Sequence, residues 1–273
     1  PSATRPWSNA ITTRFAMRLP WLPDDPRGGF PPLEQALAEP DGLLAVGGDL
    51  HPDRLLDAYR HAVFPWFSPG EPILWWSPDP RLVFDTGTFS LPRRFRRQLR
   101  TSTWRVDADT RFDEVVGQCA SAPRRGSTGT WIGAQVREAY GRLHRLGHAH
   151  SVEVLDGERL VGGLYGIAIG RMFFAESMFS AASGGSKVAL GALARQLANW
   201  DWPLIDAQVE NPHLLALGAR RTRREAFATR VQTLAALPGR TGPWTQAWQL
   251  HTAAALAAPP TGPAADAGHA GAG

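Results

Sequence analysis

The chain contains little cysteine and almost no lysine. Cys119 is its only cysteine, so the sequence excludes an intramolecular disulfide and a zinc site built from several cysteines. It also lacks an apolar run of about 18 residues, and we therefore expect no membrane-spanning helix. Residues 1–16 lack the apolar core of a secretory signal. We expect them to be an extension ahead of Met17, and we expect a cytoplasmic protein.

Positive charge comes almost entirely from arginine, because Lys187 is the only lysine and the net charge is +4. Such a mild excess is weak support for a nucleic-acid partner, and a solvated surface is the alternative. The charge is locally dense in a helix that we expect to begin near Pro92. Its arginines are candidates for a phosphate-binding surface: Arg93, Arg94, Arg96, Arg97 and Arg100.

The spacing of apolar residues predicts both helices and strands. Helical spacing occurs over 52–62, 111–120, 134–146, 187–199, 214–217 and 224–237. Alternation typical of strands runs over 150–155 and 159–169, and Asp156-Gly157 between them predicts a hairpin. Further strands are expected at 172–179 and 203–209. The order helix, three antiparallel strands, helix, strand, helix predicts an α+β fold with a mixed sheet.

Residues 64–80 combine five aromatic residues with five prolines. We expect neither a helix nor a regular strand here, but a rigid connection that ends a small N-terminal domain over residues 17–80. A larger domain then covers residues 81–250. Exposed tryptophans can stack on unpaired RNA bases, for which Trp66 is the candidate, whereas buried ones would join the two parts. Residues 251–273, mostly Ala, Pro and Gly, are expected to be a disordered tail.

Two short motifs are candidate binding sites. His144, His148 and His150 lie close in sequence, but no cysteine and no His-Glu-x-x-His pattern accompanies them, so capping and core histidines are favoured over a metal site. Residues 183–187, Ser-Gly-Gly-Ser-Lys, open a predicted helix whose free N–H groups favour anions. Lys187 is a candidate to face a phosphate there, and a flexible helix start is the alternative.

Polar residues interrupt two otherwise apolar strands. Glu176 lies within residues 173–179, and Asp206 and Gln208 lie two apart within residues 204–209. A spacing of two places both side chains on one face of a strand. Polar groups in such strands are costly unless they are paired or functional, so a catalytic set and a buried hydrogen-bond network are both open interpretations.

Sequence blocks spread over residues 30–230 resemble the leucyl/phenylalanyl-tRNA–protein transferase family. The blocks, which follow the order of that family, are residues 42–50 (GLLAVGGDL), 64–70 (FPWFSPG), 75–81 (WWSPDPR), 130–132 (TWI), 147–153 (GHAHSVE), 161–166 (VGGLYG), 176–180 (ESMFS) and 204–209 (LIDAQV). The resemblance implies a small N-terminal domain followed by a domain with an acetyltransferase-like (GNAT-like) fold.

The resemblance also implies an activity. Members of this family move Leu or Phe, and less readily Met, from aminoacyl-tRNA to proteins that begin with Arg or Lys, which marks those proteins for degradation by the N-end rule pathway. We therefore expect Leu-tRNA, Phe-tRNA and such acceptor proteins as partners, no cofactor, no metal, no membrane and a monomer. The ester of a charged tRNA is already activated, so positioning and proton transfer are the main needs.

Site residues carry over by the same resemblance. Asp206 and Gln208 match the proposed catalytic pair, and Glu176 matches a further active-site acid. Residues that match positions linked to the tRNA end or its amino acid are Trp66, Trp131, Tyr140 and the polar neighbour Asn211. Leu164, Met178 and Ile205 match the apolar donor pocket. Leu164 stands where Met is common and Phe174-Ala175 replaces smaller residues, which leaves the Leu to Phe preference open.

The expected chemistry is attack of an α-amine on the tRNA ester. Because a carboxamide is a poor proton acceptor, we expect Gln208 to orient the amine and Asp206 to hold it. Glu176 and Asp206 are expected to supply negative charge for the Arg or Lys of the acceptor. The rivals are a peptidoglycan-bridge aminoacyltransferase, an acyl-CoA N-acyltransferase and a non-catalytic RNA-binding protein, and the last leaves these polar residues without a role.

Overall fold

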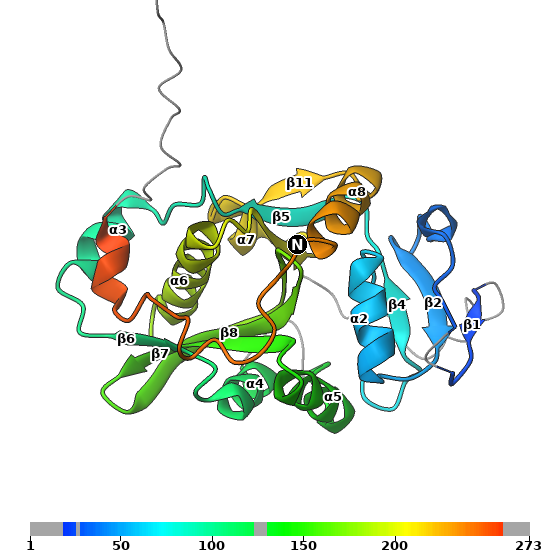
Figure 1. Ribbon diagram of the computed structural model, residues 1–273, viewed down its shortest axis with the longest axis horizontal. Coiled ribbons are helices and arrows are strands. Elements are labelled where there is room, and N and C mark those ends of the chain that lie inside the picture. The colour runs from blue at the N-terminus through cyan, green and yellow to red at the C-terminus, as the bar shows by residue number, and fades with distance from the viewer. Residues whose placement is uncertain (1–18, 26–27, 123–129, 259–273) are drawn as a thin grey trace, which may run out of the picture.

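The structure is a computed structural model that describes residues 19–25, 28–122 and 130–258. Two sheets organise these residues, a four-stranded sheet of order β1-β2-β4-β3 and a seven-stranded sheet of order β11-β5-β10-β9-β8-β7-β6. Both are mixed, since β1 runs parallel to β2 and β10 runs parallel to β9 while their other pairs are antiparallel. Figure 1 shows the smaller sheet at one end of the molecule. The predicted α+β class is confirmed.

The small sheet forms from the N-terminal part of the chain. Its elements are β1 (Trp21–Leu22), the 3-10 helix η1 (Leu33–Gln35), β2 (Leu43–Gly47), α2 (Pro52–Arg60), β3 (Phe64–Pro65) and β4 (Leu74–Trp76). The expectation of no strand within 64–80 was wrong, because β3 and β4 lie there. Proline is tolerated in β3 because β3 is an edge strand. Trp75 is fully buried, and its indole N–H donates to Gly47 O at 2.8 Å, so β4 is fixed by its aromatics.

The large sheet contains the predicted hairpin. Its strands are β5 (Arg81–Asp85), β6 (Arg105–Ala108), β7 (Ala149–Asp156), β8 (Arg159–Ile169), β9 (Met172–Ser180), β10 (Leu204–Gln208) and β11 (Arg220–Thr222). β7 and β8 turn at Asp156-Gly157, as the sequence predicts. The prediction missed β5, β6 and β11. Each is three to five residues long, too short for alternation to be distinguished from chance.

Helices cover both faces of the large sheet. They are α3 (Arg93–Leu99), α4 (Phe112–Ser121), α5 (Ala134–Arg145), α6 (Gly185–Asn199), α7 (Pro212–Ala216), α8 (Arg224–Ala235) and the 3-10 helix η2 (Ala253–Ala257). In Figure 1, α6 lies on one side of β7 and β8, and α4 and α5 lie on the other. No helix in the described part of the chain is long and apolar enough to span a membrane.

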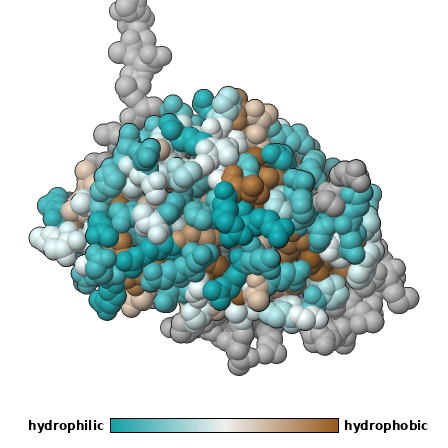
Figure 2. All heavy atoms as spheres, turned by 60° about the horizontal axis from the view of Figure 1, so that its bottom comes forward, coloured by the Kyte–Doolittle hydropathy of each residue, from teal (hydrophilic) through white to brown (hydrophobic). Residues whose placement is uncertain are grey.

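Each face of the large sheet carries its own hydrophobic cluster. One cluster packs under α6 and contains Phe173 and Ile205. The other contains Phe174 and Leu204 and continues into the small sheet through Trp75. The second cluster therefore joins the two sheets. On the face in Figure 2, brown apolar residues form small groups among hydrophilic ones, as expected when most large apolar side chains lie in these clusters.

The segment after α8 is ordered through residue 258. Trp244, Trp248 and Leu256 are buried, and Thr252 forms a β-bridge with Arg105. The predicted disorder was therefore wrong for residues 251–258, whose Ala253 and Leu256 side chains fill space next to α3 and α6. The rest of the predicted tail and the extension at 1–16 lie outside the described residues.

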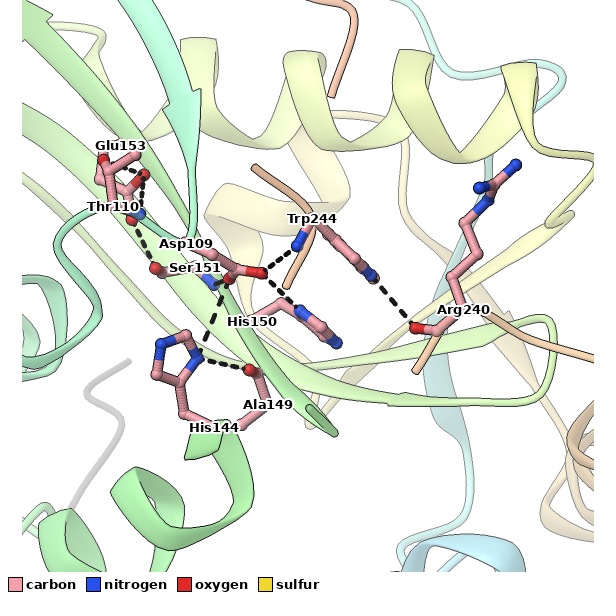
Figure 3. A network of polar contacts seen from close by, with 9 residues as sticks. All are labelled: Asp109, Thr110, His144, Ala149, His150, Ser151, Glu153, Arg240 and Trp244. Carbon is pink, nitrogen blue, oxygen red and sulfur yellow. Dashed lines mark hydrogen bonds and ion pairs between the residues drawn. The ribbon is translucent and has the colours of Figure 1, made fainter. Parts of the chain in front are cut away.

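A buried polar network fastens this segment to the sheet (Figure 3). The Asp109 carboxylate accepts from the backbone N–H groups of Trp244 at 2.7 Å and Ser151 at 2.9 Å, and it lies 2.8 Å from His150 Nδ1. The His150 ring stacks on Trp244 with centroids 3.8 Å apart. His144 Nδ1 lies 2.8 Å from Ala149 O beside the end of α5. His150 is thus a core histidine.

Candidate active site

Four polar side chains from four elements form a cluster at Glu176. The Tyr59 hydroxyl of α2 is hydrogen-bonded to Glu176 Oε1 at 2.6 Å, and the Tyr140 hydroxyl of α5 is hydrogen-bonded to Oε2 at 2.9 Å. The two tyrosine hydroxyls are themselves 2.5 Å apart. Gln208 of β10 donates its Nε2 to Glu176 Oε1 at 2.8 Å. We call Tyr59, Tyr140, Glu176 and Gln208 the carboxyl cluster.

The backbone around the cluster departs from regular pairing. β9 and β10 pair in parallel only over 172–174 and 204–206, and the pairing ends before Glu176 and Gln208. The β8–β9 register shifts between Tyr165 and Gly166, which leaves Glu176 at a bulge. Gln208 adopts a left-handed conformation with φ 61°. Irregular pairing and left-handed side-chain-bearing residues concentrate at functional sites.

Asp206 lies beside the cluster but faces a buried arginine. Arg81 Nε donates to Asp206 Oδ1 at 2.9 Å and Arg81 Nη2 donates to Oδ2 at 2.6 Å, with both side chains fully buried. Asp206 Oδ1 also accepts from the backbone N–H of Gln208 at 2.8 Å. Asp206 is therefore positioned to hold the left-handed backbone of Gln208, and each of its oxygens already accepts from Arg81.

Arg81 is enclosed by groups from distant parts of the chain. Its guanidinium carbon lies 4.6 Å from the ring centroid of Phe64 and 4.7 Å from that of Phe227. Arg81 Nη1 donates to Ala62 O at 3.2 Å. A planar guanidinium between two aromatic rings can keep its bidentate bond to a carboxylate, which a lysine cannot reproduce. The geometry of Asp206 is thus set by the N-terminal sheet, by β5 and by α8.

Burial changes the acid strength of the cluster. It raises the pKa of Glu176 to about 7, with the Asp206 charge adding to the rise and the bonds from Tyr59, Tyr140 and Gln208 opposing it. Burial and the nearby Glu176 raise the pKa of both Tyr59 and Tyr140 well above the ordinary value. The tyrosines therefore keep their protons, and Glu176 titrates close to neutral pH.

The residues expected to form the donor pocket lie on the opposite face of the sheet. Leu164 on β8 is the register partner of Met178 on β9, and Ile205 lies on the adjacent β10. All three pack in or against the cluster under α6. Leu164 and Ile205 are fully buried, while Met178 is only partly so. The apolar set therefore lies in one hydrophobic cluster, and the tyrosines of the carboxyl cluster lie in the other.

The residues expected at the tRNA end fall into two places. Trp66 packs on Trp76, with ring centroids 5.9 Å apart, and Trp131 is half-buried just before α5. The loop that carries Trp66 lies against the loop that carries Trp131. Gly133 and Pro69 approach so closely that a Cβ atom on Gly133 would lie 3.2 Å from the Pro69 side chain. Tyr140 is not on this surface: it is fully buried in the carboxyl cluster. The sequence did not predict that Tyr140 is buried while Trp66 and Trp131 are partly exposed.

The remaining predicted residues lie outside the cluster. Asn211 accepts from the backbone N–H of His213 at 2.8 Å and so caps α7. Lys187, in the first turn of α6, has its ammonium 5.5 Å from the ring centroid of Phe95. Of the arginines expected to face phosphate, Arg93, Arg94, Arg97 and Arg100 are exposed on and beside α3, and Arg96 is half-buried.

Sequence reasoning gave no role to Tyr59 or Arg81. Tyr59 lies within the helix predicted over 52–62, and Arg81 ends the sequence block 75–81. A usable signal existed for Tyr59, because the chain has only three tyrosines and a hydroxyl on an apolar helix face needs a partner. Arg81 offered none, since most of the many arginines are on the surface.

Comparisons with known proteins agree across most of the chain. A family model described as leucyl/phenylalanyl-tRNA protein transferase matches residues 83–232, and one for the N-terminal domain of that family matches residues 48–79. A protein of Xanthomonas campestris pv. campestris is 63% identical over 236 residues, covering 86% of this chain and 95% of the relative.

Two further relatives carry the same name. A protein of Xanthomonas axonopodis pv. citri is 61% identical over 243 residues, which is 89% of this chain and 98% of the relative. One of Xylella fastidiosa is 64% identical over 205 residues, which is 75% of this chain and 84% of the relative. All three relatives are named leucyl/phenylalanyl-tRNA–protein transferase.

Proposed function

The chain belongs to the leucyl/phenylalanyl-tRNA–protein transferase family, and from this premise we propose that its carboxyl cluster is an aminoacyl-transfer site. The reaction moves Leu or Phe from the 3′ end of a charged tRNA to the α-amine of a protein that begins with Arg or Lys. A peptide bond forms, and the acceptor is marked for degradation.

The observation that carries the proposal is the contact between Gln208 and Glu176 at the end of the β9–β10 pairing. Gln208 points its NH2 group at Glu176, so its carbonyl oxygen faces the other way and can accept from an incoming amine. Asp206 acts on the backbone of Gln208 rather than on the amine, because Arg81 takes both of its oxygens. Gln208 thereby orients the nucleophile.

The donor side chain would lie in the apolar set Leu164, Met178 and Ile205. Transfer of Leu or Phe from water to such surroundings is favourable by about 1.5–3 kcal/mol for full burial, which distinguishes them from polar amino acids. Met178 is the member with exposed surface. Replacing Met178 by Asp should abolish use of both donors, whereas Met178→Leu, of similar volume, should keep them. Retention of both donors in Met178→Asp would remove this residue from the pocket.

Contacts to tRNA would come from three surfaces. The adjoining loops of Trp66 and Trp131 offer aromatic rings to the unpaired 3′ bases. Lys187 at the start of α6 and the α3 arginines offer positive charge to phosphates. Asn211 would act indirectly through α7, which it caps. Tyr140 would act from within the carboxyl cluster.

Acceptor selection has one available carboxyl in this site. The charge of Asp206 is balanced by Arg81, which leaves Glu176 as the carboxyl group that can accept a hydrogen bond from the acceptor amine. We further propose that the protein works as a monomer in the cytoplasm without a cofactor, and that residues 81–250 form a GNAT-like domain after an N-terminal domain over 17–80. The parting of the parallel strands β9 and β10 supports that fold assignment.

A transfer assay tests the function directly. Labelled Leu on tRNA should pass to a peptide that begins with Arg, and a peptide that differs only in beginning with Ala should stay unlabelled. Leucyl-CoA offered in place of Leu-tRNA separates this activity from that of an acyl-CoA N-acyltransferase. Absence of label on the Arg peptide from either Leu-tRNA or Phe-tRNA would refute the proposal.

A further inference from the structure

The carboxyl cluster contains more oxygen–oxygen contacts than its tyrosines can supply with protons. Tyr59, Tyr140 and Glu176 are joined in a closed ring of three contacts at 2.5, 2.6 and 2.9 Å. Each contact needs one proton between its two oxygens, because lone pairs facing one another at such distances repel. The two hydroxyls provide two protons. The third has to come from the carboxyl group.

We propose that Glu176 rests as a neutral carboxylic acid and that the ring of Tyr59, Tyr140 and Glu176 is the proton relay of the transfer reaction. Whichever way round the ring the protons point, a neutral carboxyl gives every contact one donor and one acceptor. Ordered chains of this kind strengthen each member. The Gln208 amide adds a fourth contact, to Glu176 Oε1, that needs no further proton.

The surroundings of Glu176 favour the neutral form. Tyr59 from α2 and Tyr140 from α5 are fully buried, and Glu176 itself is only 9% exposed. The charge of Asp206 on β10 disfavours a second negative charge on Glu176, and Arg81 on β5 is paired with Asp206. Burial raises the pKa of Glu176 to about 7. A proton-transfer group is most effective when its pKa lies near the working pH.

This inference rests on the proposed function for its reaction, and the chemistry then balances. The amine nitrogen bonds to the ester carbonyl carbon, and the bond from that carbon to the ribose oxygen breaks. The nitrogen loses one proton and the ribose oxygen gains one. A neutral carboxyl can accept the first proton on one oxygen while it releases its own from the other, and the ring is then neutral again with its hydrogen bonds running in the opposite direction. No redox partner and no net charge is needed.

The protonation claim is testable without substrate. The C=O stretch of a protonated carboxylic acid absorbs apart from that of a carboxylate and shifts in D2O. Wild-type protein at pH 6 should show this band for Glu176, and it should disappear as the pH rises past 7. Glu153 is a second buried carboxyl whose pKa is raised to about 7, so Glu153→Gln identifies its share. The band that remains in Glu153→Gln should be absent from the double variant with Glu176→Gln.

Activity variants test the relay. The side-chain amide introduced by Glu176→Gln keeps a donor and an acceptor but cannot exchange protons readily, so kcat should fall roughly 10²–10⁴-fold with KM for tRNA and peptide unchanged. Tyr59→Phe opens the ring, and it should lower kcat at least about tenfold and move the midpoint of the Glu176 band. Tyr165→Phe is the matched control, because Tyr165 is the third tyrosine and is equally buried. Tyr165 packs edge-on against Tyr140, with ring centroids 5.7 Å apart, but is not one of the three members of the ring, so Tyr165→Phe should affect the rate and the band much less than Tyr59→Phe does.

Two results would overturn the relay. One is the absence of a protonated-carboxyl band from Glu153→Gln at pH 6, which would mean that Glu176 is ionised. This measurement does not need the Glu176→Gln variant, so it stands even if that variant fails to fold. The other is Tyr59→Phe with a wild-type kcat. Neither result depends on whether the wild-type protein prefers Leu or Phe as the donor. If the wild-type protein transfers neither amino acid, the proposed function is refuted rather than the relay.

Discussion

Arg81 and Asp206 form a fully buried ion pair directly behind the proposed catalytic amide. Removing one member of such a pair costs much more than removing both, because the remaining charge is buried alone. The pair therefore contributes little net stability, but it fixes where the backbone of Gln208 lies. Its role is positional, and stability measurements can separate that role from simple packing.

Arg81→Met should reduce the free energy of unfolding by about 3–5 kcal/mol, because Asp206 is left buried without its partner. Adding Asp206→Asn should recover much of that loss without restoring the transfer rate. Urea unfolding of the single and double variants measures the coupling. Arg54→Met is the control, since Arg54 is equally buried but donates to the carbonyl oxygens of Pro23 and Asp25, and its carboxylate partner is Asp49 rather than Asp206. Equal recovery by Asp206→Asn in the Arg54→Met background would contradict the pairing.

Glu153 makes stability depend on pH outside the site. Burial raises its pKa from 4.5 to about 7, so the folded protein binds more protons than the unfolded chain between these values. The stabilisation is complete below the unfolded pKa and is lost as pH rises through the folded one. Glu153→Gln imitates the neutral acid, so its gain in Tm over wild type should grow between pH 5 and pH 8. Parallel Tm curves would show that Glu153 is not titrating in this range.

At the residue scale the sequence identified some site residues and not others. Glu176, Asp206 and Gln208 were visible because polar residues in apolar strands are costly and need a reason. The contacts of their partners were not visible. Tyr59 reaches Glu176 across 117 positions of sequence, and Arg81 reaches Asp206 across 125. The role that we propose for Asp206 differs from the expected one for the same reason. No local pattern says which buried arginine will reach a given carboxylate.

At the scale of elements, α3 is unusual for its uncompensated charge. Within the described ranges, Arg93, Arg94 and Arg97 are exposed and none has a carboxylate partner. Arg111, Arg142 and Arg159 are instead paired with Glu114, Glu138 and Asp156. Both sets consist of three arginines, and only the second set is paired with carboxylates. The second set therefore serves as a control for substitutions in the first.

Changing Arg93, Arg94 and Arg97 to Gln should weaken tRNA binding and flatten its dependence on salt. The slope of log K against log salt should fall by about 0.7–0.9 for each phosphate that is no longer neutralised. Filter binding over a salt series measures this slope. The same change at Arg111, Arg142 and Arg159 should leave the slope near that of wild type. Equal flattening in both triple variants would assign the effect to net charge rather than to α3.

Elements with a strong period or a defined turn were predicted well. The β7–β8 hairpin and the helices α5, α6 and α8 lie within a few residues of their expected bounds, because their apolar faces and turn residues are local signals. β4 was missed because its flanking prolines suggested irregular chain. β5 and β11 were missed because a strand of five or three residues depends on its neighbours in the sheet rather than on its own composition.

At the scale of the whole molecule, the ordered C-terminal segment is part of the large unit. It reaches back to the turn before α4 through Asp109, which binds Trp244, His150 and Ser151 (Figure 3). Its tryptophans Trp244 and Trp248 fill the cluster under α6. The composition predicted a disordered tail from residue 251. That prediction was wrong for residues 251–258 because alanine, which is common in flexible chain, also fits the narrow spaces of a packed core.

Asp109→Ala should destabilise the whole protein by about 3 kcal/mol or more, because buried donors at Trp244 and Ser151 lose their acceptor at about 1–3 kcal/mol each. Thermal unfolding measures the loss, and amide exchange should rise first in residues 240–258. Asp107→Ala is the control on the neighbouring strand β6, since Asp107 forms a partly exposed ion pair with Arg105. Its effect should stay below about 1 kcal/mol. A similar loss in both variants would deny Asp109 its anchoring role.

The enclosure of Arg81 between Phe64 and Phe227 has a consequence for biosynthesis. Tyr59 and Phe64 leave the ribosome early, whereas Gln208 and Phe227 lie far along the chain and emerge late. The guanidinium can therefore be sheltered only after nearly the entire polypeptide has emerged. A truncated translation product would contain Phe64 but not Phe227. Incomplete chains should therefore have no transfer activity.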